Sequence, residues 1–168
     1  ILAALPELVE KVQIIHSVGS LHLTDVTGEA GVILEKSLHK NRYHVFGFLD
    51  AAQLRNASYI STIVVSRAGA GSIFEIAAWG LPAILIPLPP PVAAQDHQRE
   101  NAYAYARTGA ALVMEETNLT PHLLISQIFS LLADDKKTRE MKRNSRLFAK
   151  IDAAQKIAEE LIRLGLHD

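Results

Sequence analysis

Short apolar runs alternate with helical patterns along most of this 168-residue chain. Runs of strand length lie at 12–16, 43–47, 62–66, 83–87 and 111–114. The segments between most of them have the length and periodicity of helices, which is typical of parallel strands joined by helical crossovers. Because a parallel sheet is covered on both faces, its strands are apolar throughout. The sequence therefore predicts an α/β fold, with a parallel sheet and helices on both faces.

The helices expected from the same pattern follow the strands and also fill the C-terminal part of the chain. We expect them at 27–40, 51–58, 72–79, 96–107, from 121 onward, and at 135–149 and 152–164. In the helix at 27–40, the apolar side would consist of Ala30, Val32, Ile33 and Leu38. Thr120 is expected to cap the helix that begins with Pro121.

Composition and charge exclude several classes of function. Lys and Arg number 17 against 18 Asp and Glu, so the basic excess that usually marks nucleic-acid binding is missing, and no nucleic-acid partner is expected. There is no cysteine, which excludes disulfides and thiolate zinc sites. No segment approaches the ~18–20 uninterrupted apolar residues of a membrane span. We expect an ordinary soluble globular domain.

The chain begins with Ile1, inside an amphipathic pattern and without a basic leader. We therefore expect residues 1–168 to form a single domain that is part of a longer protein.

The segment most informative about function joins the strand at 62–66 to the helix at 72–79. Its turn consists of small residues, with glycines at 69 and 71. At a helix N-terminus, unpaired N–H groups and the helix dipole attract anions, and glycines let a diphosphate approach the backbone. Glu75 lies about one helical turn further on, where its carboxylate can accept hydrogen bonds from a ribose diol. Together these features predict a nucleotide site.

Each of these residues also has a purely structural interpretation. The glycines equally suit a turn that only lets helix and sheet pack closely. The Arg67 side chain can form a structural ion pair with a carboxylate as readily as it can contact a ligand. Glu75 would by default lie on a solvated face; a partly enclosed carboxylate is the alternative, because its immediate neighbours Phe74 and Ile76 are apolar.

A second polar cluster, residues 95–101, follows the strand at 83–87 and a proline-rich loop. Ligands of open α/β sheets bind outside the carboxyl ends of the strands, so both turns should face one crevice. Asp96 is expected to be an N-cap. His97 suits a general base or a metal ligand, but no second ligand stands at metal-binding spacing. Gln98 and Asn101, three residues apart, can present amides to sugar hydroxyls.

A basic stretch lies near the C-terminus. Its cations are Lys136, Lys137, Arg139, Lys142, Arg143 and Arg146. One interpretation is that these cations bind an anionic membrane surface by electrostatic attraction. A solvated helix face fits better, because Asp134, Asp135 and Glu140 are interleaved with them.

Taken in order, these motifs resemble the MurG family, which transfers N-acetylglucosamine (GlcNAc) from UDP-GlcNAc to lipid I and so makes lipid II. The resemblance is strongest over 43–125. The segments that carry it are 48–50 (FLD), 65–70 (VSRAGA), Glu75, 80–83 (GLPA), Pro87, 96–98 (DHQ), 101–102 (NA), 109–111 (GAA) and 119–120 (LT). It implies an α/β, Rossmann-like domain that ends in helices and forms the C-terminal, donor-binding half of a GT-B glycosyltransferase.

The resemblance also implies the residues that bind the UDP-sugar. They are Leu49, Arg67, Gly69, Ala70, Gly71, Ser72, Glu75, His97, Gln98 and Asn101. The backbone around Leu49 would meet the uracil edge, Gly71 and Ser72 would hold the diphosphate, and Glu75 would bind the ribose hydroxyls.

Four of these residues concern the sugar. Ala70, His97 and Gln98 would lie near the GlcNAc, and Asn101 would support the helix that carries His97 and Gln98.

The chain departs from the family pattern at its start. The first strand of the domain and its Gly-Gly-Ser turn are missing, as is the N-terminal domain with the acceptor site. The family's His-Gln-x-Gly stands here as residues 16–19, His-Ser-Val-Gly. We therefore expect no catalytic residue in this chain, and no turnover by it alone.

The resemblance implies a full-length inverting hexosyltransferase that needs no cofactor and no metal. The absence of an Asp-x-Asp motif agrees with this expectation. Its partners would be UDP-GlcNAc and lipid I. It would be cytoplasmic, or peripherally bound to the cytoplasmic face of a bacterial cell membrane. Two alternatives stay open, namely another GT-B transferase that uses a UDP-sugar, and a non-catalytic nucleotide-binding domain.

Overall fold

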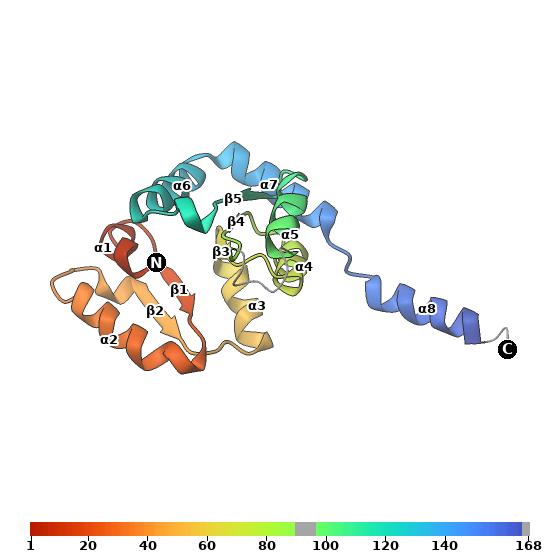
Figure 1. Ribbon diagram of the computed structural model, residues 1–168, viewed down its shortest axis with the longest axis horizontal. Coiled ribbons are helices and arrows are strands. Elements are labelled where there is room, and N and C mark those ends of the chain that lie inside the picture. The colour runs from red at the N-terminus through yellow and green to blue at the C-terminus, as the bar shows by residue number, and fades with distance from the viewer. Residues whose placement is uncertain (90–96, 166–168) are drawn as a thin grey trace. The chain divides into compact units, whose positions relative to one another are not determined.

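The computed structural model describes residues 1–89 and 97–165 (Figure 1). The chain forms two compact units. The first unit consists of residues 1–62 and 117–135, and the second of residues 63–116 and those from 136 onward. Parallel strands flanked by helices occur in both, so the predicted fold class is confirmed. That the two act as a single domain stays a prediction.

The first unit contains two strands and several helices. They are α1 (Leu5–Leu8), β1 (Ile14–Ser17), α2 (Leu23–Ile33), β2 (Tyr43–Phe46), α3 (Ala51–Ile60) and α6 (Pro121–Ala133), with short 3₁₀ turns at Leu2–Ala4, Ser20–His22 and Lys40–Arg42. β1 pairs in parallel with β2, from Ile14 opposite Tyr43 to Ser17 opposite Phe46. A small buried cluster of Leu5, Val9, Ala30 and Leu34 supports this pair.

The helix predicted at 27–40 lies instead at Leu23–Ile33, so its predicted bounds were wrong. Val32 and Leu38, expected on its apolar side, are 76% and 91% exposed. The buried side is set by Ala30 and Leu34, one turn apart and both almost fully buried. After Leu34 the chain turns, with the Ser37 N–H donating to the Leu34 carbonyl, and the helix ends.

Two helix starts in this unit follow from local capping. Asp50 and Gln53 form a capping box at the start of α3, in which each side chain accepts a hydrogen bond from the other residue's backbone N–H. The Thr120 hydroxyl accepts a hydrogen bond from the Leu123 N–H, and Pro121 occupies the first position of α6. The predicted cap at Thr120 is therefore confirmed.

The second unit contains the segments in which the sequence predicts the nucleotide site. Its elements are β3 (Val64–Ser66), α4 (Ala70–Trp79), β4 (Ala83–Leu85), α5 (His97–Ala106), β5 (Ala111–Val113), the 3₁₀ turn Glu116–Asn118 at its boundary, α7 (Asp135–Phe148) and α8 (Ala153–Gly165). The strands pair in parallel in the order β3–β4–β5. Their register aligns Ser66, Leu85 and Val113, so the loops that follow these residues leave from the same edge.

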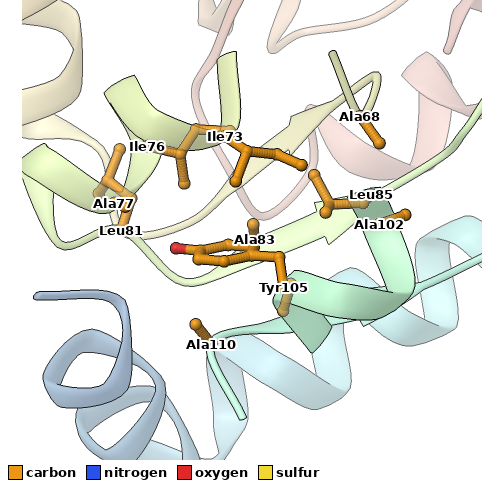
Figure 2. Packing of buried hydrophobic residues seen from close by; sticks show 11 residues of the cluster. Ala68, Ile73, Ile76, Ala77, Leu81, Ala83, Leu85, Ala102, Tyr105 and Ala110 are labelled. Atoms are coloured by element: carbon orange, nitrogen blue, oxygen red, sulfur yellow. The ribbon is translucent and has the colours of Figure 1, made fainter. Parts of the chain in front are cut away.

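The core of this unit lies around β4, whose three residues are all buried (Figure 2). Figure 2 shows Ile73, Ile76 and Ala77 of α4 beside β4, with the Tyr105 ring of α5 close to Ala83. The Tyr105 hydroxyl lies 2.8 Å from the Ser145 Oγ of α7, so the buried polar groups satisfy each other. This packing fixes both α4 and α5 against the sheet.

A test of this packing compares two glycines. Gly80 ends α4 with φ +67°, and a Cβ there would lie 2.6 Å from Arg146 Nε. Gly28 lies inside α2 and a Cβ there would meet nothing within 4 Å. We expect Gly80→Ala to lower the free energy of unfolding by about 1–2 kcal/mol, since the left-handed conformation disfavours a side chain. Gly28→Ala should raise it by about 0.5–1 kcal/mol. Urea unfolding followed by circular dichroism measures both, and equal midpoints for Gly80→Ala and wild type would contradict the left-handed end of α4.

Candidate functional site

The start of α4 is a helix N-terminus without a side-chain cap. Gly69 occupies the N-cap position, and the first intrahelical bond runs from the Ile73 N–H to the Gly69 carbonyl. Ala70 and Gly71, in the first turn, are exposed. The N–H groups of a first helical turn have no partner inside the helix, so they are available to an anion from solvent.

The conformations of Gly69 and Gly71 argue against a purely structural reason for glycine. Gly69 has φ −64°, and neither residue is among the glycines with positive φ. Among the described residues, a Cβ at Gly71 would meet nothing within 4 Å, and one at Gly69 would meet only the Ser72 Oγ at 4.0 Å. Close packing of helix and sheet therefore does not require these glycines. Their missing side chains leave open space in front of the helix, which an approaching phosphate needs.

Glu75 lies on the same face of α4 as Gly71 and Ser72, four and three residues further along. It is exposed, as the default interpretation of a solvated helix face predicted, and Phe74 and Ile76 do not enclose it. The reason is that Ile76 turns into the core, whereas Phe74 stacks on Phe148 with ring centroids 5.6 Å apart. The carboxylate is thus exposed at a position from which it can meet a ligand that binds across the start of the helix.

Helix α5 carries the described part of the second polar cluster and contacts the loops that follow β3 and β4. The Asn101 side-chain amide donates a long hydrogen bond of 3.5 Å to the Ala68 carbonyl in the β3–α4 loop. The Gln98 Oε1 accepts one of 3.2 Å from the Leu88 N–H in the loop after β4. α5 therefore joins both loops that the sequence predicted to face one crevice. Asp96, expected to be an N-cap, lies outside the described residues.

His97 is exposed at the start of α5, with its Nδ1 3.8 Å from Glu100 Oε2. Within the described parts of the chain, no group of three or more His, Cys, Asp or Glu residues is placed to hold a metal ion. Donor binding without a metal stays a prediction.

Arg67 is held by the protein itself. Its guanidinium makes two hydrogen bonds to the Glu116 carboxylate, of 2.7 and 3.2 Å, and a third of 3.1 Å to the Ile86 carbonyl. The hydrogen bonds from Arg67 lower the pKa of Glu116. This geometry favours the structural ion pair that the sequence left open for Arg67, and it ties the loop after β3 to those after β4 and β5.

A neighbouring hydrogen-bond network around Glu115 was not predicted from the sequence. The Glu115 Oε1 accepts hydrogen bonds from the Tyr103 hydroxyl at 2.7 Å and from Arg99 Nε at 2.9 Å. The hydrogen bonds from Tyr103, which has the larger effect, and from Arg99 lower the pKa of Glu115. The same hydrogen bond to Glu115 raises the pKa of Tyr103. The available signal was a pair of consecutive carboxylates directly after the strand at 111–114, at the edge where the predicted site lies.

The remaining predicted positions belong to the first unit. Leu49 is half-buried in the connection between β2 and α3, directly before the capping residue Asp50. His16 Nδ1 lies 2.9 Å from the Tyr43 hydroxyl, and burial lowers the pKa of His16. Gly19, which ends the His-Ser-Val-Gly motif, has φ +84°, a conformation that favours glycine.

Comparison with known proteins identifies the family. The model of the glycosyltransferase family 28 C-terminal domain matches residues 1–161. The chain belongs to this family. A relative from Geobacter metallireducens, named UDP-N-acetylglucosamine--N-acetylmuramyl-(pentapeptide) pyrophosphoryl-undecaprenol N-acetylglucosamine transferase, is 35% identical over 96% of this chain and 42% of its own length. A relative of the same name from Trichormus variabilis is 41% identical over 73% of this chain and 33% of its own length.

Solved structures agree with this assignment to family 28. Acinetobacter baumannii MurG matches with a TM-score of 0.75 and 25% identity, over 96% of this chain and 44% of that one. The glycosyltransferase VinC, solved with dTDP, matches with a TM-score of 0.71 at 19% identity, over the whole of this chain and 38% of that one, and shows the fold alone. The chain is thus a C-terminal domain of the MurG type, and it spans less than half the length of these relatives.

The two arginine–carboxylate networks can be tested separately. In Arg67→Met, the pKa of Glu116 should rise toward its ordinary value, because the carboxylate loses the cation that favours its charged form. The pKa of Glu115 should stay low. A carboxylate with a lowered native pKa stabilises the fold above its unfolded pKa, and this contribution disappears as the pH falls through the native pKa. NMR titration of the side-chain carboxyl carbons measures both groups, and a Glu116 pKa that does not move in Arg67→Met would contradict the pairing.

Proposed function

We propose that this chain is the donor-binding part of an inverting glycosyltransferase that transfers GlcNAc from UDP-GlcNAc to lipid I, which gives lipid II. The observation that carries this proposal is the start of α4, which has no side-chain cap, with the exposed Glu75 carboxylate one turn further on. Membership in family 28 and the printed names of its relatives support the choice of donor and acceptor.

The geometry suggests how such a donor would be held. The N–H groups of Ala70, Gly71 and Ser72 would bind the diphosphate, and the Glu75 carboxylate would accept hydrogen bonds from the ribose hydroxyls. When the acceptor hydroxyl attacks the anomeric carbon, the diphosphate leaves with increased negative charge. The oriented N–H groups and the dipole of α4 would stabilise that charge, without a metal.

Further predicted contacts concern the sugar and the base of the donor. In the second unit, His97 and Gln98 would approach the GlcNAc. The uracil contact of the backbone near Leu49, which belongs to the first unit, stays a prediction from the family resemblance. Asn101 would act through the Ala68 carbonyl by holding α5 against the β3–α4 loop. The lipid I acceptor and the catalytic base would belong to the part of the protein outside this chain, so this chain alone should show no turnover.

A titration with three ligands tests the donor assignment. UDP and UDP-GlcNAc should bind the chain more tightly than ADP, in calorimetry. Glu75→Ala should weaken UDP-GlcNAc binding about tenfold or more, because a hydrogen bond to a charged group is worth about 1.5–3 kcal/mol. The matched control is Glu140→Ala, which removes an exposed carboxylate from α7. Equal affinity for UDP and ADP would contradict a uridine site.

We further propose that the protein associates peripherally with the cytoplasmic face of the bacterial cell membrane. No described helix is long and apolar enough to span a bilayer. One hollow on α7 is lined by Arg139, Lys142, Arg143, Arg146 and Leu147, and no carboxylate among the described residues lines it. The spacing of the four cations puts them on one side of the helix. Asp135, four residues before Arg139, lies on the same side at the start of α7, but neither it nor Glu140 lines the hollow. Anionic lipid attracts such a surface by about 1 kcal/mol per cation.

Vesicle sedimentation tests this surface. The chain should sediment with phosphatidylcholine vesicles that contain phosphatidylglycerol, and not with phosphatidylcholine alone. The double variant Lys142→Glu, Arg143→Glu should lose this binding. A control of equal charge change, Lys36→Glu with Lys40→Glu, alters exposed lysines of the first unit and should retain it. Equal losses in both double variants would instead indicate a general charge effect and a merely solvated helix face.

A further inference from the structure

We propose that Glu115 and Glu116 are positioning residues for the donor site. Each of these adjacent carboxylates holds a different ligand-bearing segment in place. The inference rests on the proposed function for the identity of the ligand, but the contacts that carry it are independent of that ligand. They lie wholly within the second unit.

Glu116 holds the loop that leads into α4. Its partner Arg67 directly follows β3 and stands two residues before Gly69, the N-cap of α4. Arg67 also donates to the Ile86 carbonyl, directly after β4. One guanidinium therefore connects the loops that follow β3, β4 and β5, and it fixes where the open helix start lies relative to the sheet.

Glu115 holds α5 in the same way. Its partners Arg99 and Tyr103 are four residues apart and so lie on one side of that helix. Their contacts with Glu115 fix the rotation of α5 about its axis. The helix also carries Gln98 and Asn101, which reach the loops after β4 and β3.

Two consecutive residues thus set the relative position of both ligand-bearing segments. Glu115 and Glu116 follow β5 after one residue, Met114, and one contacts α5 while the other contacts the β3–α4 loop. A ligand that touches both α4 and α5 binds best when the two are already placed, because it then need not order them.

The exposure of these ion pairs indicates that they hold the β3–α4 loop and α5 in place, and that they contribute little to the stability of the fold. The side chains of Arg67 and Glu116 are 47% and 36% exposed. Those of Arg99 and Glu115 are 50% and 25% exposed. Ion pairs so accessible to water contribute little to the free energy of folding. Their removal should therefore alter the two segments locally and leave the unfolding midpoint nearly unchanged.

The first experiment needs no ligand. Amide hydrogen exchange of the chain is compared in wild type, Glu115→Gln, Glu116→Gln and the control Glu140→Gln. We expect Glu116→Gln to speed exchange by up to about fivefold at 73–76, the first hydrogen-bonded amides of α4, and Glu115→Gln to do so at 101–104 of α5, with the other segment unchanged in each case. Wild-type exchange rates in both segments would overturn the proposal, as would a uniform increase over the whole second unit, which is the result of a merely structural role.

The second experiment measures UDP-GlcNAc binding by calorimetry in the same four proteins. Glu115→Gln and Glu116→Gln should each weaken binding by up to about fivefold at an unchanged urea midpoint. The charge swap of Arg67→Glu with Glu116→Arg should restore affinity relative to Arg67→Glu alone. Wild-type affinity in both Gln variants would overturn the positioning role. A wild-type chain that does not bind UDP-GlcNAc would instead contradict the proposed function, and the exchange experiment would still decide the positioning role.

Discussion

The arrangement of the candidate site depends on the burial of β4. Ala83, Ile84 and Leu85 are completely buried, so this strand must have parallel neighbours on both edges and apolar cover on both faces. Since all three strands run in one direction, the loops that follow them leave from one edge. Everything proposed here about the donor site in the second unit concerns groups that lie at that edge because β4 is central.

Glycine serves two different physical purposes in α4. At the C-terminal end, Gly80 has φ +67° and lies under the Arg146 side chain, so conformation and packing both require it. At the N-terminal end, neither conformation nor packing requires Gly69 or Gly71. This contrast within one helix supports a ligand as the reason for the glycines at its start, because no described residue fills the space in front of Gly71.

The resemblance to the MurG family, read from short motifs, agreed with the family model and with the relatives. Local signals such as the Thr120 cap were also correct, because a cap depends on residues three positions apart. The helix at 27–40 was misplaced because several apolar residues in that stretch, such as Val32 and Leu38, stay in solvent. An apolar residue at the right spacing does not by itself indicate a buried face.

The sequence alone determined the alternation of strands and helices, the open turn at 67–72, and the family. These depend on periodicity and on motifs, which are short-range properties. Only the tertiary structure decided what Arg67 does, because its partner Glu116 is 49 residues away and is brought near by the register of β3, β4 and β5. It likewise decided that Glu75 is exposed and that Glu115 holds α5. Such pairings depend on which strand ends the register of the sheet aligns, and no local pattern in the sequence predicts that register.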